Sequence, residues 1–229
     1  MFKKHFPFRY SLLGLILVLI LSLLPLTTFS QPITQATIAE ILDSDQVFIQ
    51  NQKVSLNSIA EQGQQIRTEQ ARAGLKFINN AVIRIGNNSS FIVGSHCIQL
   101  ERGQLLISGN QRGCIGSIVA VTRGTIYVLE IDEETGEGTI QVLEGAVEVS
   151  DPEDPEIEPK TIEAGYKIQV LPSGLLGIIE QLTTGDLTRL LQGQLFQGFR
   201  IPIPNLNNII KPPSVPRSPR LPRFPFPFR

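Results

Sequence analysis

Short apolar runs, cut by glycine, asparagine, serine and proline, repeat along the chain from Thr37 to Val170. β-Branched residues dominate these runs, and none of the runs is long enough for an ordinary helix with its own apolar stripe. Clear examples are Ala81–Ile85, Ser117–Val121, Thr125–Leu129 and Thr139–Val142. Short strands with frequent turn signals are typical of all-β domains. We therefore predict a single antiparallel β-sandwich or roll over residues 31–182.

Turn signals predict how neighbouring strands are joined. Glu133–Gly138 lies between two apolar runs and is expected to form a hairpin tip, and Asn79–Asn80 is a second candidate turn because asparagine tolerates positive φ. Glu144–Gly145 is short enough to reverse the chain, which predicts a third hairpin between the strands that flank it. The alternating pattern of these two strands places Gln141 and Glu148 on a solvent-exposed face.

Near Thr184 the apolar residues change to a helical spacing. Four leucines then fall on one helical face: Leu187, Leu190, Leu191 and Leu195. Thr183 and Asp186 have the spacing of a capping box, with aspartate in the place of glutamate or glutamine. We predict one short helix, from about Gly185 to Leu195 within residues 183–199, that docks its leucine face on the sheet.

Residues 200–229 contain six basic residues, no acidic residue and, from Ile201 onward, nine prolines. This segment has no periodic apolar pattern, so it is expected to be an extended or disordered tail. Arginine, phenylalanine and proline alternate near its end, which is typical either of a partner-binding strip or of a solubilising tail. The candidate partner-binding residues are Arg217, Arg220, Arg223, Phe224, Phe226, Phe228 and Arg229.

The first 30 residues have the pattern of a secretory signal peptide. Three basic residues precede an apolar run from Leu12 to Leu24, and Thr28 and Ser30 supply small residues before a cleavage site at Gln31. An uncleaved membrane anchor is the alternative. In both cases the remainder of the chain faces away from the cytoplasm. We therefore predict an extracytoplasmic location, in the periplasm, in the cell envelope or outside the cell.

Charge is distributed unevenly along the chain. Between Gln31 and Phe199, 11 basic and 21 acidic residues leave a net charge of −10, whereas the residues from Arg200 onward carry +6. Opposite charges of this size are expected to attract each other or to find separate partners. The acidic body argues against a nucleic-acid partner.

Candidates for catalysis are few. His96 adjoins Cys97, but neighbouring residues on a strand point to opposite faces, which separates the imidazole from the thiol. No cysteine or histidine spacing suits zinc, and there is no nucleophile elbow or phosphate-binding glycine loop. The acidic segment Asp151–Pro159 does not match an EF-hand, so we interpret it as a solvated loop rather than a Ca²⁺ site. We expect a non-catalytic chain that needs no cofactor or metal.

Cys97 and Cys114 are the only cysteines. An even count in an exported chain predicts one disulfide, which would close a loop of about 18 residues and stabilise the fold by about 3 kcal/mol. A straight strand from Ile98 to Ser108 would hold the two sulfurs far apart, so the disulfide requires a bend at Glu101–Gly103. Two free buried thiols are the alternative.

Several short segments follow one another in a recognisable order between about residues 62 and 170. They include Gly63, Thr68, Ala73–Phe77, Val82–Ile85, Leu100–Ile107, Arg123, Gly124, Thr125, Val142–Val149 with Glu144 and Gly145, Ala164, Gly165 and Val170. The most specific part is an Arg-Gly-Thr followed by a Leu-Glu-Gly. Taken together, these segments resemble the FecR domain. The glycines in them permit bends and turns, so the resemblance identifies a scaffold more securely than a task.

The best-known members of this family sense an occupied outer-membrane transporter and regulate an extracytoplasmic-function sigma factor through a cytoplasmic segment. Here only about nine residues precede the apolar run, which we expect to be too few to engage a sigma factor. The chain is more similar to the stand-alone exported FecR-domain proteins, including those of cyanobacteria. The resemblance implies an all-β, extracytoplasmic domain.

We therefore expect a non-catalytic FecR-like binding or interaction module at the cell envelope. Its partner is expected to be an unidentified protein or an envelope polymer, and not a nucleic acid. Membrane contact is expected only through an uncleaved N-terminal segment. One alternative function is a membrane-anchored, signal-transducing sensor of the FecR type, and another is a polysaccharide- or peptidoglycan-binding protein.

Overall fold

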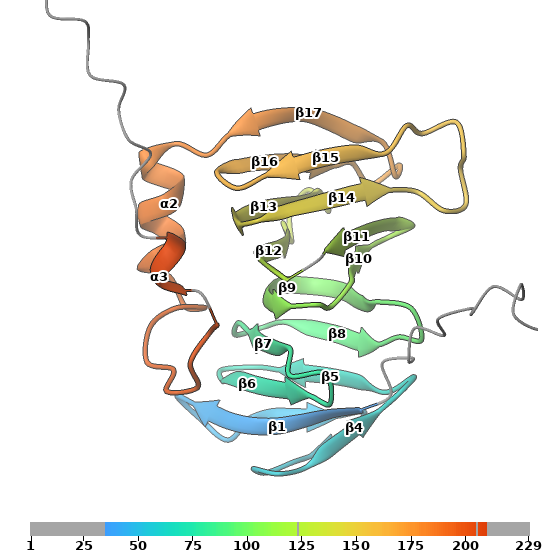
Figure 1. The fold of residues 1–229 in the computed structure, drawn as a ribbon. Coiled ribbons are helices and arrows are strands. Elements are labelled where there is room, and N and C mark those ends of the chain that lie inside the picture. Colours follow the sequence, from blue (N-terminus) through green and yellow to red (C-terminus); the bar gives the residue numbers. More distant parts are fainter. Residues whose placement is uncertain (1–34, 123, 205, 210–229) are drawn as a thin grey trace, which may run out of the picture. The chain divides into compact units, whose positions relative to one another are not determined.

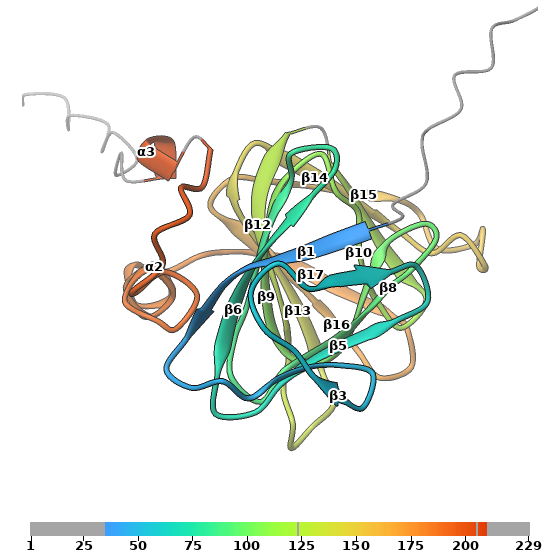
Figure 2. The same ribbon diagram turned by 90° about the horizontal axis from the view of Figure 1, so that it is seen from below.

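The computed structural model describes residues 35–122, 124–204 and 206–209. In this part of the chain, strands form two sheets that pack face to face, which confirms the predicted all-β class (Figure 1; Figure 2). The predicted signal peptide, residues 1–30, lies outside the described residues, as do Arg123 and the tail from residue 210 onward. No helix in the described ranges is long and apolar enough to cross a membrane.

The two sheets are named sheet A and sheet B. In spatial order, sheet A contains β4 (Ile59–Glu61), β1 (Gln35–Leu42), β6 (Arg72–Phe77), β7 (Val82–Ile85), the second part of β9 (Ile98–Gly109), β12 (Thr125–Ile131), β13 (Gly138–Glu144), β16 (Tyr166–Val170) and β17 (Leu176–Gln181). Sheet B contains β3 (Gln52–Lys53), β2 (Val47–Ile49), β5 (Gln65–Thr68), β8 (Ser90–Val93), the first part of β9, β10 (Gly113–Ile115), β11 (Ile118–Thr122), β14 (Ala146–Ser150) and β15 (Lys160–Glu163).

Strand β9 belongs to both sheets and joins them. Its first part pairs with β8 and β10 in sheet B, and the residues from Gly103 onward pair with β7 and β12 in sheet A. Gly103 has φ = +77°, and a Cβ atom there would lie 2.2 Å from the Oγ of Ser89. Glycine is therefore required at this bend. The bend at Glu101–Gly103, which we predicted as a condition for the disulfide, is therefore present.

The main core lies between the two sheets. Ile140 and Val142 reach it from sheet A, and Val147 and Val149 reach it from sheet B, and all four are completely buried. The large side chain of Tyr127 is also fully buried, and its hydroxyl donates a hydrogen bond of 2.8 Å to the carbonyl of Gln111. The buried hydroxyl of this large side chain therefore has a hydrogen-bond partner.

The outer face of sheet A is covered as well. Helices α2 (Thr184–Leu191) and α3 (Leu206–Ile209) run along this side of the sandwich (Figure 1). Together with the chain around them they form a second core with the sheet. This second core consists of Leu106, Ile126, Val128, Leu143, Leu182, Leu190, Leu195 and Ile203. Burial on both faces explains why the run Thr125–Leu129 is continuously apolar and does not alternate.

The predicted capping box of α2 is confirmed, because Thr183 and Asp186 exchange both of its hydrogen bonds. The helix ends at Leu191, earlier than predicted, because Gly193 turns the chain and donates its N–H to the carbonyl of Leu190. Leu195 therefore reaches the second core from the turn that follows the helix. The single turn of α3 was not predicted.

Two of the three predicted hairpins are present. Glu133–Gly138 joins β12 to β13, and Asn79–Asn80 joins β6 to β7, with Asn80 at φ = +63°. The third, at Glu144–Gly145, is wrong. Strand β13 pairs with β12 and β16 in sheet A, whereas β14 pairs with β11 and β15 in sheet B. The two strands show matching apolar patterns because they face the same core from opposite sides.

The predicted exposure of the two polar residues on these strands is half right. Glu148 is exposed on sheet B, but Gln141 is buried. The reason is the second core, which covers the outer face of sheet A where Gln141 lies. A sequence pattern cannot show that a distant segment of the chain covers a polar position.

Glycines mark the points where the second half of the chain passes from one sheet to the other. Gly124, Gly145 and Gly165 have φ of +80°, +75° and +88°, and each lies between a strand of sheet A and a strand of sheet B. The last two are adjacent in space, since the carbonyl of Gly145 accepts the N–H of Ala164 at 2.9 Å. Positive φ lets the chain leave one sheet within a single residue.

We predict that Gly145→Ala lowers the free energy of unfolding by about 2–4 kcal/mol, because it combines backbone strain with a steric clash. The new Cβ would lie 2.7 Å from the Cγ2 of the buried Thr125. Gly165→Ala is the matched control, because its φ is similar and no heavy atom lies within 4 Å of the new Cβ. It should cost about 1–2 kcal/mol. Urea unfolding followed by circular dichroism measures both, and equal losses would contradict the prediction.

Candidate functional site

The two cysteines form the predicted disulfide. Cys97 directly precedes β9 and Cys114 lies in β10, and their Cα atoms are 5.9 Å apart. These two strands run parallel, with Gly113 opposite Ile98, which brings the cysteines together. The alternative of two free thiols is wrong. The disulfide braces the one parallel strand pair among the described strands, next to the bend of β9.

The family-motif residues occupy structural positions. Gly63 has φ = +85° and precedes β5, while the buried Thr68 donates a hydrogen bond of 2.6 Å to the carbonyl of Gly86. The buried Thr125 donates its hydroxyl to Thr122 across the turn at Gly124. Glu144 ends β13 directly before Gly145. These residues shape turns and sheet passages, and they do not gather into one pocket.

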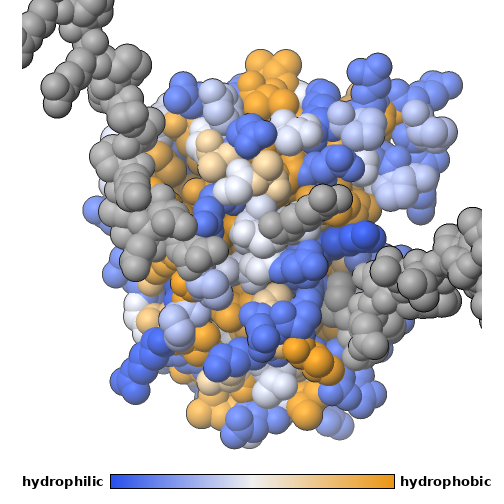
Figure 3. Space-filling view, in the orientation of Figure 1, coloured by the Kyte–Doolittle hydropathy of each residue, from blue (hydrophilic) through white to orange (hydrophobic). Residues whose placement is uncertain are grey.

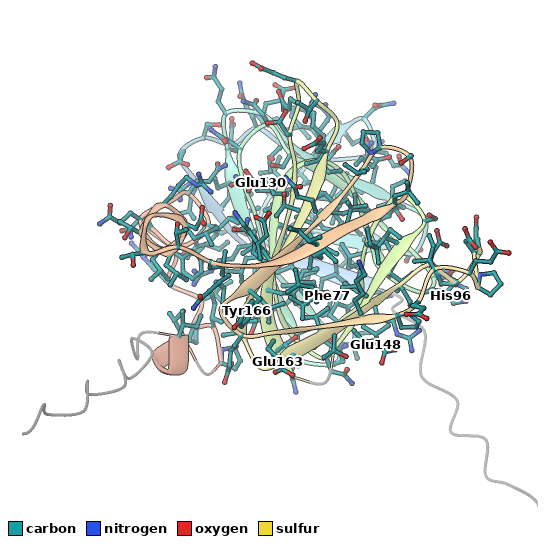
Figure 4. All side chains as sticks on the ribbon, turned by 90° about the horizontal axis from the view of Figure 1, so that it is seen from above. Phe77, His96, Glu130, Glu148, Glu163 and Tyr166 are labelled. Atoms are coloured by element: carbon teal, nitrogen blue, oxygen red, sulfur yellow. A yellow bond between two sulfur atoms is a disulfide. The ribbon has the colours of Figure 1, made fainter. Side chains whose placement is uncertain are left out.

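No catalytic constellation appears among the residues that the structure describes. His96 is exposed at the side of the molecule, where its Nδ1 lies 2.7 Å from the Oγ of Ser95 (Figure 4). Its neighbour Cys97 is held in the disulfide and has no thiol to pair with it. Within the described ranges, no group of three histidine, cysteine or acidic side chains is arranged to hold a metal ion.

The acidic loop between β14 and β15 is anchored at its first residue. Asp151 accepts hydrogen bonds from the hydroxyl of Ser117, at 2.5 Å, and from the N–H of Glu153, and these bonds lower the pKa of its carboxyl group. Glu153, Asp154 and Glu156 point into solvent. The loop therefore presents negative charge at the surface beside the last strands of sheet B.

A half-buried polar network lies beneath α2, around a pocket of about 240 Å³. Glu130 accepts hydrogen bonds from the amides of Gln104, at 2.5 Å, and Gln141, at 3.2 Å. Gln194 donates to Gln104 and accepts the N–H of Asn87. These amides hold the turn after α2 against sheet A, and the network contains a carboxylate but no nucleophile.

Two arginines hold the segment Gln194–Ile203, here called the clasp, on sheet A. The guanidinium of Arg84, which is only 3 % exposed, donates to the carbonyls of Leu195 and Ile201 at 3.0 and 2.8 Å and lies 4.5 Å from the ring centroid of Phe199. Burial lowers the pKa of Arg84 to about 10, and the nearby Glu40 opposes this shift. A buried cation without a bonded carboxylate is costly, so the carbonyls must be present to satisfy it.

Arg72 and Glu40 complete the attachment. Arg72 donates to the carbonyls of Gln194 and Gln197 at 2.6 and 2.7 Å, and it pairs with Asp43, whose pKa it lowers. Glu40 accepts the N–H groups of Arg200 and Ile201. Strands β1, β6 and β7 thereby fix a segment more than a hundred residues away in the chain.

The clearest unpartnered surface is strand β17, at one end of sheet A. It pairs only with β16 among the described strands, and its side chains are unusually apolar for an edge. Ile178 is 75 % exposed and Ile179 is 42 % exposed, and Leu175 and Tyr166 are exposed beside them. Apolar side chains gather over β17 at the top of the space-filling view (Figure 3).

The backbone of β17 is also available for pairing. The N–H of Leu182 donates to the carbonyl of Gly165, and Gln181 and Ile179 lie opposite Tyr166 and Ile168. Because bonding alternates along an antiparallel pair, the N–H and C=O groups of Ile179 and Gln181 point away from β16. The carbonyl of Gly177, by contrast, accepts a hydrogen bond from Lys160.

The edge strands at the opposite end of the two sheets are shorter than β17. There the edge strands β4 and β3 have three and two residues, and the exposed apolar residues are Leu56 and Ile59. Very short edge strands are a common protection against unwanted pairing. The six-residue β17 lacks this protection. No sequence signal singled it out, because its exposure follows from its place at the end of the sheet.

We predict that Arg84→Met releases the clasp without unfolding the sandwich, because the apolar side chain stays buried but leaves two carbonyls without a donor. Amide exchange over the clasp should become about tenfold faster. Arg67→Met removes the same charge from sheet B, where Arg67 contacts Phe48, and is the control. Unchanged exchange over the clasp in Arg84→Met would refute this role.

The charge of Asp186 should make the stability of the fold depend on pH. The Thr183 backbone N–H, then its hydroxyl and Lys167, lower the pKa of Asp186 below its ordinary value of 3.8. A lowered folded-state pKa adds stability above the ordinary pKa, and this stability is lost as the pH falls through the lowered value. Asp186→Asn should therefore lower the free energy of unfolding by about 0.5–1 kcal/mol at neutral pH.

The difference between Asp186→Asn and the natural chain should disappear at about pH 2, where the carboxyl group is protonated. Urea unfolding at both pH values measures it, with Glu163→Gln, at an exposed position, as the control. A difference that persists in acid would show that Asp186 acts by something other than its charge.

Comparisons with known proteins give only a partial similarity to solved structures. No protein-family model matches the chain, and no curated protein sequence shows significant similarity to it. Two crystal structures described as a candidate anti-sigma factor from Parabacteroides distasonis are similar in part. They match at 13 % and 15 % identity with TM-scores of 0.46 and 0.45, over 56 % of this chain and 65 % and 64 % of theirs. This chain thus spans less than two thirds of those proteins.

Proposed function

We propose that this chain is a non-catalytic, extracytoplasmic binding module that recognises an extended peptide segment by adding it to the edge of sheet A. The observation that carries this proposal is the edge strand β17, whose outer side is open and whose side chains are apolar and exposed. The partner we propose is a protein of the cell envelope that offers an extended segment.

Strand addition fits the chemistry of this edge. The outward backbone groups of Ile179 and Gln181 supply hydrogen bonds that do not depend on the partner's sequence. Ile178, Ile179 and Tyr166 supply apolar contacts on either side of the strand, and these give selectivity. An exposed apolar edge strand of this length is a site of aggregation when it has no partner. A binding partner that covers the strand would explain why it is apolar.

The extracytoplasmic part of the proposal rests on two observations. The disulfide between Cys97 and Cys114 is compatible with an oxidising compartment, where such bonds persist. The N-terminal pattern of basic residues, apolar run and small residues is that of an export signal. The non-catalytic part rests on the polar groups of the clasp and of the network around Glu130, whose hydrogen bonds attach the segment after α2 to sheet A.

The proposal is tested by placing a photo-cross-linking residue at Ile178 in the full chain and irradiating the native envelope. The control position is Ile78, which is 73 % exposed in the β6–β7 turn and so has nearly the same exposure as Ile178. We expect specific protein adducts at 178 and not at 78. Ile179→Pro, which removes one outward N–H, should reduce the adducts several-fold.

Proline is tolerated where an edge N–H faces away from the sheet, so this variant should fold. Equal adducts at both positions, or none at 178, would refute binding at this edge. Retention on purified cell-wall polymer without any dependence on β17 would instead favour a polymer-binding function.

A further inference from the structure

The sequence of residues 224–228 has a pattern suited to the edge of a sheet. Phe224, Phe226 and Phe228 alternate with Pro225 and Pro227. In an extended strand, alternate residues direct their N–H and C=O groups to the same side. The three phenylalanines therefore have donors and acceptors on one side, and Pro225 and Pro227 remove the N–H groups from the other side between Arg223 and Arg229. Such a strand pairs on one side and ends the sheet there.

We propose that the segment Arg223–Arg229 docks on β17 of the same chain, as the final strand of sheet A. The proposal rests on the proposed function, because it assigns the regulation of the same edge. Residues that precede proline favour extended backbone, which prepares Phe224 and Phe226 for this role. The outward groups of Ile179 and Gln181 provide the complementary partners.

Side chains and charges are complementary as well. The three phenylalanines share one face of an extended strand, and in antiparallel pairing with the outward groups of Ile179 this is the face of the exposed Ile179. Glu163 lies in β15, the last strand of sheet B, and Glu180 lies in β17, the last strand of sheet A. The net charge of −10 between residues 31 and 199 is opposite in sign to the +6 of the residues from Arg200 onward. Arg223 and Arg229 flank the aromatic segment, and their positive charges are complementary to Glu163 and Glu180.

The chain is long enough for this docking to be intramolecular. Helix α3 ends at Ile209, which packs in the second core, and α3 lies against β13. Only β16 separates β13 from β17 in sheet A, so the two strands are about 10 Å apart. Residues 210–222, in an extended proline-rich form, span about 40 Å. A tether of this length gives a local concentration on the order of millimolar, which favours the chain's own segment over a second copy.

Docking of the segment would control access to the edge. An external strand must displace Arg223–Arg229 before it can pair with β17, so the segment acts as a competitor that is always present. Because Pro225 and Pro227 remove two neighbouring N–H groups from its outer side, the docked segment also disfavours edge-to-edge pairing of two copies. This accounts for a long apolar edge in a chain that is exported.

The test compares the full chain with a variant of identical composition, Pro225→Phe with Phe226→Pro, which breaks the alternation. Amide hydrogen exchange is followed by NMR at Ile179 and Gln181. We expect exchange at these two amides to be about tenfold faster in the variant, whereas the amide of Ile78 should not change. Equal exchange at Ile179 and Gln181 in both proteins would overturn the proposal.

Two further readouts separate the possible outcomes. Protection that disappears on dilution would place the segment on a neighbouring copy and overturn the intramolecular docking. In the photo-cross-linking experiment, the variant should give a higher yield of external adducts at Ile178. Protected amides at Ile179 and Gln181 without any external adduct would support the docking and refute the proposed function. External adducts at Ile178 without protected amides would support the proposed function and refute the docking.

Discussion

Burial of both faces of sheet A is the constraint on which the rest of this structure depends. One face carries the main core, and the other carries Leu106, Ile126, Val128 and Leu143, which would be exposed without the segment that follows β17. The hydrophobic effect therefore brings the C-terminal segment across the sheet. The clasp and the network around Glu130 then satisfy the polar groups that this covering buries.

The passages between the sheets impose a second constraint. A strand can leave one sheet for the other only where the backbone turns sharply, and Gly124, Gly145 and Gly165 provide positive φ at three such points. The bend at Gly103 does the same within β9, and the disulfide lies next to that strand. The glycines of the Arg-Gly-Thr, Leu-Glu-Gly and Ala-Gly segments thus direct the chain between sheets.

The two proposals follow from the same geometry. Because the chain builds sheet A strand by strand, the sheet must end somewhere, and β17 ends it with exposed isoleucines. Helix α3, the last element that the structure describes, lies against β13, two strands from this edge. An open edge, an extended segment of a partner and a tethered competitor are the minimal parts of a regulated binding module.

The sequence by itself determined the all-β class, the capping box at Thr183, the hairpins at Asn79–Asn80 and Glu133–Gly138, and the disulfide. These features depend on local backbone preferences or, for the disulfide, on the count of cysteines. Tertiary structure alone decided that Gly145 passes between sheets, that Gln141 is buried and that β17 is an open edge. Each of these depends on which distant segment lies alongside, and a local pattern contains no record of that neighbour.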